Sequence, residues 1–367
     1  MSTTKKIYLN EIFMLRAVAC LSIVLVHSLA VAQSGISNIS DYLDVVVNSV
    51  RVLLTFGTPT FVFISMLLIS YSYPNGLPTT FLGRRAKLIL LPYLSMAVFY
   101  ALVHGLASAL PIKEILINAS LNILGAYHGY FVLIIFQFYL LCYFFNNYLS
   151  KKNPFTVILI SLIINLIYLA IFNFSSSPID NSLVNYFWVR WHWIPFIGWV
   201  FYFTVAYYCG KNYSEFLFLL NKNKNLILAS TVSIGALTVI LTNLKIIPLS
   251  SKSIMMIFFA TSMIATLYYI ATKVKDTHHL FMKISEYSFS IYLLHMFFIS
   301  IVSKALKVLG INLGILNVVF LFIGSIIGSM LMTYIINRFK FGKYLVGRIN
   351  SVGVKAKLGY GHRSLRS

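Results

Sequence analysis

Long apolar runs recur along almost the whole chain, and they constrain its fold more than any other feature. Each run holds about 20 mostly apolar residues, the length that an α-helix needs to cross the hydrocarbon core of a bilayer. The runs cover residues 12–32, 46–71, 88–108, 128–148, 154–172, 188–209, 225–243, 253–272, 284–303 and 313–336. The sequence therefore predicts an all-α, polytopic integral membrane bundle of about ten transmembrane helices.

Composition excludes a soluble alternative. Of the 367 residues, 59% are hydrophobic and only 10% are charged, whereas soluble domains carry roughly a quarter charged residues. The net charge of +21 would suggest a nucleic-acid partner if the basic residues formed one patch. They lie instead in short loops between apolar runs, so the expected partner is the lipid bilayer and no nucleic acid. The three cysteines lack metal-ligand spacing, so no metal site is expected.

The distribution of lysine and arginine predicts the orientation. With the N-terminus placed inside, 22 of the 29 basic residues fall on the cytoplasmic side and 7 fall outside, as positive-inside loops require. An even number of helices then leaves both termini in the cytoplasm. We expect residues 1–340 to form one transmembrane domain and residues 341–367 to form a basic cytoplasmic tail that lies on anionic lipid.

Three features leave alternatives open. The stretch 112–126 is apolar but short, so it is either a re-entrant or an interfacial segment. Two lysines, the apolar residues 17–26 and Ala30-Val31-Ala32 resemble a cleavable secretory signal, but the apolar region is long for a signal, which favours a retained first helix. The four tryptophans lie between residues 188 and 199. They favour an interfacial aromatic belt over a sugar-stacking platform.

The first predicted helix carries three charged or titratable side chains that are costly inside a membrane, Glu11, Arg16 and His27. Arg16 and His27 are eleven residues apart, which is close to three helical turns, so these two side chains lie on one face, about 16 Å apart along the axis. Arg16 is placed near the cytoplasmic surface and His27 past the middle of the bilayer. This pattern suggests an anionic ligand at one end and proton chemistry at the other. The alternative is that Arg16 reaches the headgroups and His27 bonds a neighbouring helix.

A second imidazole and an inner loop add to this pattern. His295 lies at a depth similar to that of His27, on a helix that runs outward, so the two rings can form one site. Histidine is a natural general base because its ordinary pKa is near the working pH. The loop Arg84-Arg85-Ala86-Lys87 gathers three cations that could grip phosphates, although the same charges could serve only to set topology.

These residues resemble the signatures of the acyltransferase-3 family of membrane acyltransferases. The run from Arg16 to His27 is similar to the Arg-x10-His motif, and the Ser-x-Tyr-Leu-x-His that ends at His295 is similar to the late-helix motif. The inner-loop pattern of the family is Arg-x-x-Arg shortly before a proline. Here Lys87 stands in place of the second arginine and Pro92 lies five residues beyond it, so how this loop would grip a ligand stays open.

Within that family the chain resembles the intercellular adhesin protein C group, which is tied to poly-N-acetylglucosamine of biofilms. The stretches that carry this likeness are Phe56-Gly57-Thr58-Pro59, Leu91-Pro92-Tyr93, Gly129-Tyr130-Phe131 with Gln137-Phe138, and Phe196-Ile197-Gly198-Trp199 with Tyr202-Phe203.

The resemblance implies a multi-pass protein of the bacterial cell membrane that moves an acetyl or succinyl group from cytoplasmic acyl-CoA, a co-substrate, to a hydroxyl of a surface glycan. No bound cofactor is implied. His27 and His295 would be catalytic, and Arg16, Arg84, Arg85 and Lys87 would bind the donor. The main alternative is an exporter of a surface polysaccharide, and a further one is a structural partner of a glycan synthase complex.

Overall fold

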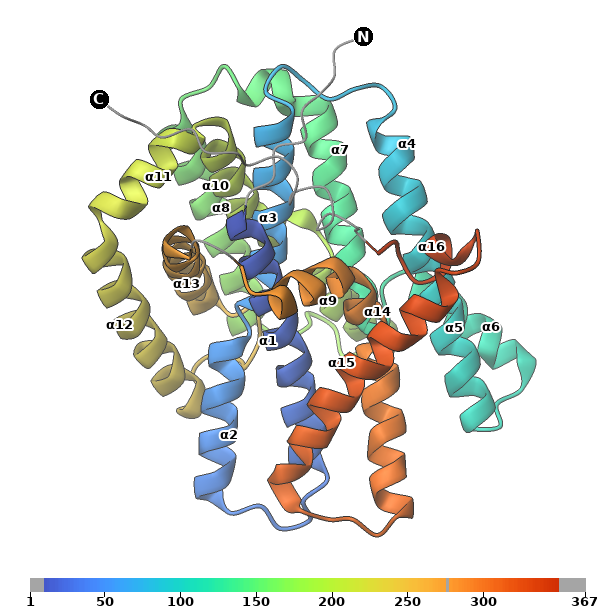
Figure 1. Cartoon of the computed structure of the whole chain (residues 1–367). Helices are drawn as coiled ribbons and strands as arrows, with labels where there is room; N and C mark the ends of the chain where they lie inside the picture. Colours follow the sequence, from blue (N-terminus) through green and yellow to red (C-terminus); the bar gives the residue numbers. More distant parts are fainter. Residues whose placement is uncertain (1–9, 275–276, 350–367) are drawn as a thin grey trace.

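The computed structural model describes residues 10–274 and 277–349, and these residues form a bundle of helices without a β-strand (Figure 1). The α-helices are, in chain order, α1 (Asn10–Ser34), α2 (Asp41–Leu54), α3 (Gly57–Ser72), α4 (Phe81–Arg85), α5 (Leu91–Ala107), α6 (Ile112–Ile123), α7 (Phe131–Leu149), α8 (Pro154–Phe174), α9 (Ser182–Trp193), α10 (Val200–Lys211), α11 (Tyr213–Lys222), α12 (Lys224–Asn243), α13 (Ile254–Lys273), α14 (His279–Val308), α15 (Asn317–Ile336) and α16 (Gly342–Leu345). A π-helical turn, η1 (Ala86–Leu90), joins α4 to α5, and the short 3₁₀ turns η2 (His128–Tyr130), η3 (Phe196–Trp199) and η4 (Gly314–Leu316) precede α7, α10 and α15.

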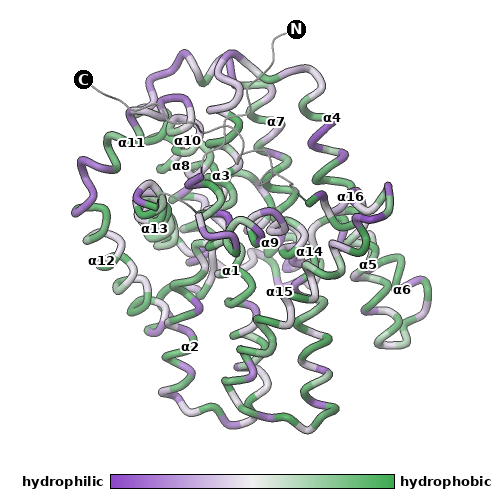
Figure 2. Tube along the Cα trace, in the orientation of Figure 1, coloured by the Kyte–Doolittle hydropathy of each residue, from purple (hydrophilic) through white to green (hydrophobic). Residues whose placement is uncertain are grey.

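Nine helical segments of the described chain are long and apolar enough to cross a membrane. Figure 2 shows hydrophobic residues along most of their length, with hydrophilic ones gathered in α4, where α11 joins α12, and in the connections at the same end of the bundle. Isoleucine, leucine and phenylalanine side chains remain exposed on their outward faces, which in water would be unfavourable but in lipid is not. The predicted all-α, polytopic membrane bundle is confirmed.

Helix α1 lies at the centre of the bundle, in contact with α2, α3, α13, α14 and α15. Its contact with α3 is unusually close because Gly57 begins that helix. A Cβ atom at Gly57 would lie 2.7 Å from the Ser22 hydroxyl and 2.8 Å from the Ala19 carbonyl oxygen, distances that real side chains do not adopt. The residue that starts α3 therefore holds the middle of α1 in place, and α1 carries both Arg16 and His27.

Two predicted helices are broken in the structure. The run 46–71 is divided between α2 and α3, because the helix stops at Leu54 and a new one begins at Gly57. The run 188–209 is divided between α9 and α10, and this break is the reason that nine continuous spans are found and not ten. Pro195 lies in the break, where it lacks the N–H that a helix needs and its ring would clash with the carbonyl group of the preceding turn.

The tryptophans on either side of this break do not form one interfacial belt. Trp199 is fully buried in the core of the bundle, whereas Trp191 is 62% exposed. Trp193 lies between them in exposure, and the Lys252 ammonium sits over its ring, 4.2 Å from the centroid. The aromatic-belt interpretation is thus wrong for Trp199, because η3 turns its indole inward.

The stretch 112–126 is largely helical and forms α6, which lies beside α5 (Figure 1). Two side chains tie the end of α6 to α5. The Tyr93 hydroxyl contacts the carbonyl oxygens of Asn122 and Ile123 at 2.8 and 2.9 Å, and the Asn122 amide donates to the Ala97 carbonyl oxygen at 3.0 Å. These bonds hold the residues that follow α6, including His128, against the middle of α5.

Residues 342–349, which the sequence assigns to a basic tail, are packed against the bundle. Helix α16 contacts α5, η1 and α15, and Gly342, Val346 and Gly347 are buried. The Asn337 amide donates to the Gly347 carbonyl oxygen at 3.0 Å, which folds the chain back after α15. The expectation of a tail lying on lipid is therefore wrong for this part. The rest of it, residues 350–367, and the two N-terminal lysines lie outside the described residues.

The connections between the helices lie at two opposite ends of the bundle (Figure 1). Helices α4 and α11 and the α7–α8 connection lie at one end, and the α1–α2 and α14–α15 connections lie at the other. The α7–α8 connection and α11 share an end of the bundle. Helix α8 therefore runs away from that end, and the broken segment α9–η3–α10 returns to it. The broken segment thus takes the place of the tenth crossing.

A prediction follows for the orientation. A reporter that is active only in the cytoplasm should be active when fused after Lys340, and one that is active only outside should be active when inserted within 174–184. The reason is the 22 to 7 distribution of lysine and arginine between the two sets of loops. An inactive cytoplasmic reporter after Lys340, with the fusion present in the membrane, would show an odd number of crossings.

Candidate active site

Small and apolar residues on one face of α1 bring it against α14. Ala17, Cys20 and Val24 follow one another at helical spacing, and they are buried together with Ile284 and Ile291 of α14. Short side chains let the two backbones approach closely, which favours helix association in lipid. This contact sets the first histidine-bearing helix beside the second.

Three imidazoles meet where α1, α14 and η2 come together. The ring centroid of His295 lies 5.2 Å from that of His27 and 5.1 Å from that of His128. His295 is fully buried. The structure therefore brings together the two histidines that the sequence singles out, although they are separated by more than 260 residues, and it adds a third.

Hydrogen bonds fix the tautomer of His295. Its Nδ1–H donates to the Tyr292 carbonyl oxygen at 2.8 Å and lies 3.1 Å from the Ile291 carbonyl oxygen. A neutral imidazole carries one N–H, so Nε2 is left with its lone pair. This Nε2 is buried and has no hydrogen-bond partner among the described residues. A buried acceptor with no partner is costly, and here it lies in a cluster of imidazoles suited to proton transfer.

His128 is the member of this cluster that sequence reasoning missed. The His128 Nε2–H donates to the Leu293 carbonyl oxygen at 3.2 Å, and the Tyr292 hydroxyl donates to the backbone carbonyl oxygen of His128. The rings of Tyr100 and Tyr127 pack edge-on against its imidazole, at 4.8 and 5.3 Å between centroids. In the sequence it starts an apolar run and follows a short, irregular stretch, so no helical spacing connects it with the other two histidines.

Tyr100 shapes the turn of α14 that carries His295. Its hydroxyl donates to the Leu293 carbonyl oxygen at 2.9 Å and accepts from the Phe297 N–H at 3.1 Å. The hydroxyl is thereby inserted between two backbone groups that would otherwise bond only to each other, a common cause of helix bending. Helix α14 changes direction part-way along its length (Figure 1).

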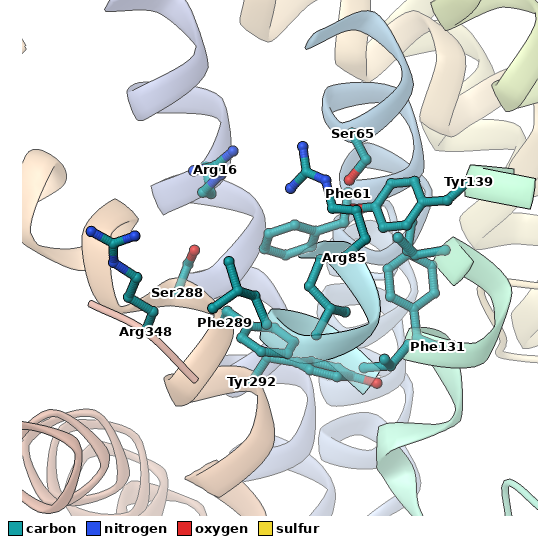
Figure 3. A pocket seen from close by; sticks show the side chains of 14 residues that line it. Arg16, Phe61, Ser65, Arg85, Phe131, Tyr139, Ser288, Phe289, Tyr292 and Arg348 are labelled. Atoms are coloured by element: carbon teal, nitrogen blue, oxygen red, sulfur yellow. The ribbon is translucent and has the colours of Figure 1, made fainter. Parts of the chain in front are cut away.

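A cavity of about 220 Å³ lies on the other side of Tyr292 (Figure 3). It is lined by Arg16, Phe61, Ser65, Arg85, Leu88, Ile89, Phe131, Val132, Ile135, Tyr139, Ser288, Phe289, Tyr292 and Arg348. Three arginines are present in this set and no aspartate or glutamate. Figure 3 shows the arginine side chains toward one end and the Tyr292 ring at the other. Such a site favours an elongated ligand with an anionic end and an apolar remainder.

The four cations proposed for donor binding divide into two groups. Arg16 and Arg85 line the cavity, whereas Arg84 and Lys87 are exposed and do not line it. Aromatic rings explain the difference, because the Arg85 guanidinium lies 5.2 Å from the ring centroids of both Phe81 and Tyr139. These cation–π contacts hold Arg85 toward the cavity, and the π-helical turn η1 begins directly after it.

Tyr292 separates the cavity from the imidazoles. Its ring lines the cavity, and its centroid lies 6.1 Å from the centroids of both His128 and His295. Phe131 packs edge-on against it at 6.3 Å. Tyr292 therefore borders both the arginine-lined cavity and the histidine cluster.

Comparison with known families decides what this arrangement belongs to. Residues 9–334 match the family model described as an acyltransferase domain, acyltransferase-3. The match covers far more than half of the chain. The protein belongs to the acyltransferase-3 family. It is accordingly an acyltransferase, and its multiple apolar helices make it a multi-pass membrane protein.

Relatives of this acyltransferase match along nearly their whole length. A Bacillus subtilis protein provisionally named membrane-bound acyltransferase YfiQ is 37% identical over 354 residues, 93% of this chain and 95% of that protein. Staphylococcal relatives are provisionally named poly-β-1,6-N-acetyl-D-glucosamine export proteins. The one from Staphylococcus aureus is 29% identical over 348 residues, covering 92% of this chain and 97% of its own. The one from Staphylococcus epidermidis is 27% identical over 347 residues, covering 91% and 94%. No solved structure matches.

The family match also marks a boundary within this acyltransferase. It includes Arg16, Arg85 and all three histidines of the cluster, and it ends at residue 334. The segment that folds back against α5 and brings Arg348 to the cavity lies beyond that end. One of the three arginines of the cavity is therefore supplied by a part of the chain outside the family model.

Proposed function

We propose that this acyltransferase moves an acyl group, acetyl or succinyl, from a cytoplasmic acyl-CoA to a hydroxyl of a cell-surface polysaccharide. The observation that carries the proposal is the single-ring separation, at Tyr292, between an arginine-lined cavity and a cluster of buried imidazoles. An acyl-CoA has the matching shape, with phosphates at one end and a thioester at the other. The names of the staphylococcal relatives support a glycan as the acceptor.

The donor would enter with its phosphates on the arginines. Arg16 and Arg85 make charge-assisted hydrogen bonds to phosphate oxygens, for which their forked guanidinium groups are well suited. The apolar side chains of Leu88, Ile89 and Ile135 would then surround the pantetheine arm. A cavity of about 220 Å³ holds only part of so large a molecule, so the nucleotide end would lie at the mouth and the thioester toward Tyr292.

The imidazoles would handle the proton of the acceptor. His27 accepts the proton of the acceptor hydroxyl as that oxygen forms a bond to the thioester carbonyl carbon. The His295 Nε2 lone pair, which has no partner among the described residues, would accept an N–H from His27 once the donor and acceptor are bound, and would so orient it, as a carboxylate does in other catalytic groups. When the carbon–sulfur bond breaks, the departing CoA sulfur takes the proton from His27. Donor thiol and acylated hydroxyl are the products, and His27 returns to its neutral form.

The names of the staphylococcal relatives favour a second candidate, export of the polysaccharide itself. The experiment that separates the two compares surface glycans of cells with and without the gene by mass analysis. We expect the acyl-to-sugar ratio to fall in cells without the gene. A constant ratio, together with less glycan at the surface, would contradict acyl transfer and support export.

A matched pair of arginine variants tests the donor site. Arg85→Ala should weaken acyl-CoA binding by about tenfold or more, the value of one charge-assisted hydrogen bond to phosphate. Arg84→Ala removes the same charge one residue away, from a side chain that does not line the cavity, so it should leave the Kd nearly unchanged. The measurement is acyl-CoA titration of the purified membrane protein. Equal effects of the two variants would mean that the loop acts only through its total charge.

A further inference from the structure

The C-terminal segment that follows α15 places a third arginine at the cavity, and nothing in the family motifs accounts for it. Arg348 is exposed but lines the cavity together with Arg16 and Arg85. Figure 3 shows it reaching the cavity beside Ser288, from the side opposite to Arg85. Its position beyond residue 334 puts it outside the family match.

The segment is seated by specific contacts, so the placement of Arg348 is built into the fold. The neighbouring residue Gly347 has φ +90°, a conformation that favours glycine, and a Cβ there would lie 2.6 Å from the Phe289 ring. Val346 is buried in a cluster with Tyr93 and Leu293. The Asn337 amide holds the Gly347 carbonyl oxygen at 3.0 Å.

Three guanidinium groups around one cavity, with no carboxylate among its lining residues, call for a ligand with several negative charges. Coenzyme A carries a pyrophosphate and a separate 3′-phosphate on its ribose. The 3′-phosphate belongs to the nucleotide end, which is the part farthest from the thioester. Arg348 is more exposed than Arg16 or Arg85, so it lies where the outermost phosphate would be.

We propose that Arg348 binds the 3′-phosphate of the donor and that residues 342–349 are thus a part of the donor site. The proposal rests on the proposed use of acyl-CoA. It assigns the discrimination between CoA and its dephosphorylated form to a residue outside the family match. Arg16 and Arg85 would then bind the pyrophosphate, which CoA and its dephosphorylated form both contain.

The test is a titration of the full-length protein with CoA and with 3′-dephospho-CoA. The wild type should bind CoA about three to ten times more tightly, a modest factor because the contact is exposed to water. Arg348→Ala should weaken CoA binding by that factor, leave dephospho-CoA binding unchanged and so abolish the difference. Arg348→Lys should keep part of it, since the charge remains and the fork is lost.

Two further variants test whether the effect depends on the placement of Arg348 at the cavity. Arg338→Ala removes an arginine of the same part of the chain that bonds Tyr334 and does not line the cavity, so it should retain the wild-type difference. Gly347→Val leaves Arg348 in the chain but cannot adopt the seated conformation, so it should behave like Arg348→Ala.

The possible results are distinguishable. If Arg348→Ala weakens the binding of CoA and of dephospho-CoA equally, the arginine binds the pyrophosphate and the proposal is wrong. If it leaves CoA binding unchanged but reduces association with vesicles containing anionic lipid, Arg348 binds lipid headgroups and the proposal is also wrong. If the wild type binds neither CoA nor dephospho-CoA, it is the proposed donor itself that fails.

Discussion

His27→Gln should lower acylation of the surface glycan by about 10² to 10⁴-fold, the usual contribution of a positioned proton-transfer group. Glutamine keeps a similar size and some hydrogen bonding but cannot titrate. The His27 ring lies 5.2 Å from that of His295 and is not among the residues that line the cavity, so its loss removes the proposed base without altering the arginines. Donor binding should therefore change little.

The measurement is the acyl-to-sugar ratio of the surface glycan, at matched amounts of protein in the membrane. His104→Gln is the control, because it makes the same exchange at an exposed histidine of α5. It should leave the ratio at the wild-type value. If His27→Gln leaves the ratio unchanged and lowers only the total glycan, the protein acts in export and the imidazoles have a structural role.

His295→Gln should produce a loss in the same range, about 10² to 10⁴-fold, for a different reason. His295 presents a lone pair at Nε2 because two backbone carbonyl groups fix the proton on Nδ1. In the proposed mechanism this lone pair accepts the N–H of His27, so without it the other nitrogen of His27 would lose its orientation toward the acceptor hydroxyl. Acylation kinetics in membranes that contain each variant would measure this loss.

The double variant distinguishes one catalytic unit from two independent effects. Groups that act together show strongly non-additive losses, so His27→Gln with His295→Gln should be about as impaired as either single variant. A loss equal to the product of the two single losses would show that the histidines act separately. A fall in the amount of folded protein in the membrane would reveal a packing role for His295, which is fully buried.

The helical class of the fold could be predicted from the sequence because a bilayer demands long apolar runs. The breaks within those runs could not. The run 46–71 stays largely apolar across the break at residues 55–56, and the close approach of α1 to Gly57, directly after the break, is a contact between distant segments. The break at Pro195 carried a local signal, which the continuous apolar pattern on both sides obscured.

The candidate site was predictable to the extent that membrane burial makes polar groups conspicuous. Arg16 and His27 share a helix face, and helical geometry alone relates them. His128 escaped notice because it lies on a three-residue turn, and its relation to His295 is made by η2 packing on α14. Arg84 and Arg85 are adjacent residues of the same type, so the sequence does not show which of them faces the cavity. The contacts of Arg85 with the rings of Phe81 and Tyr139 make that difference. Arg348 looked like one more charge in a basic tail.

The position of Tyr292 has a consequence for the cell as a whole. A membrane that stores energy as a proton gradient must remain an electrical insulator, and a water-filled line of arginines and imidazoles from one face to the other would short-circuit it. The cavity ends at the Tyr292 ring, whose hydroxyl is bonded to the backbone of the histidine cluster and whose flank is covered by Phe131. In the proposed acyl transfer, the Tyr292 ring would both admit the acyl group to the imidazoles and close the cavity against a continuous path for protons.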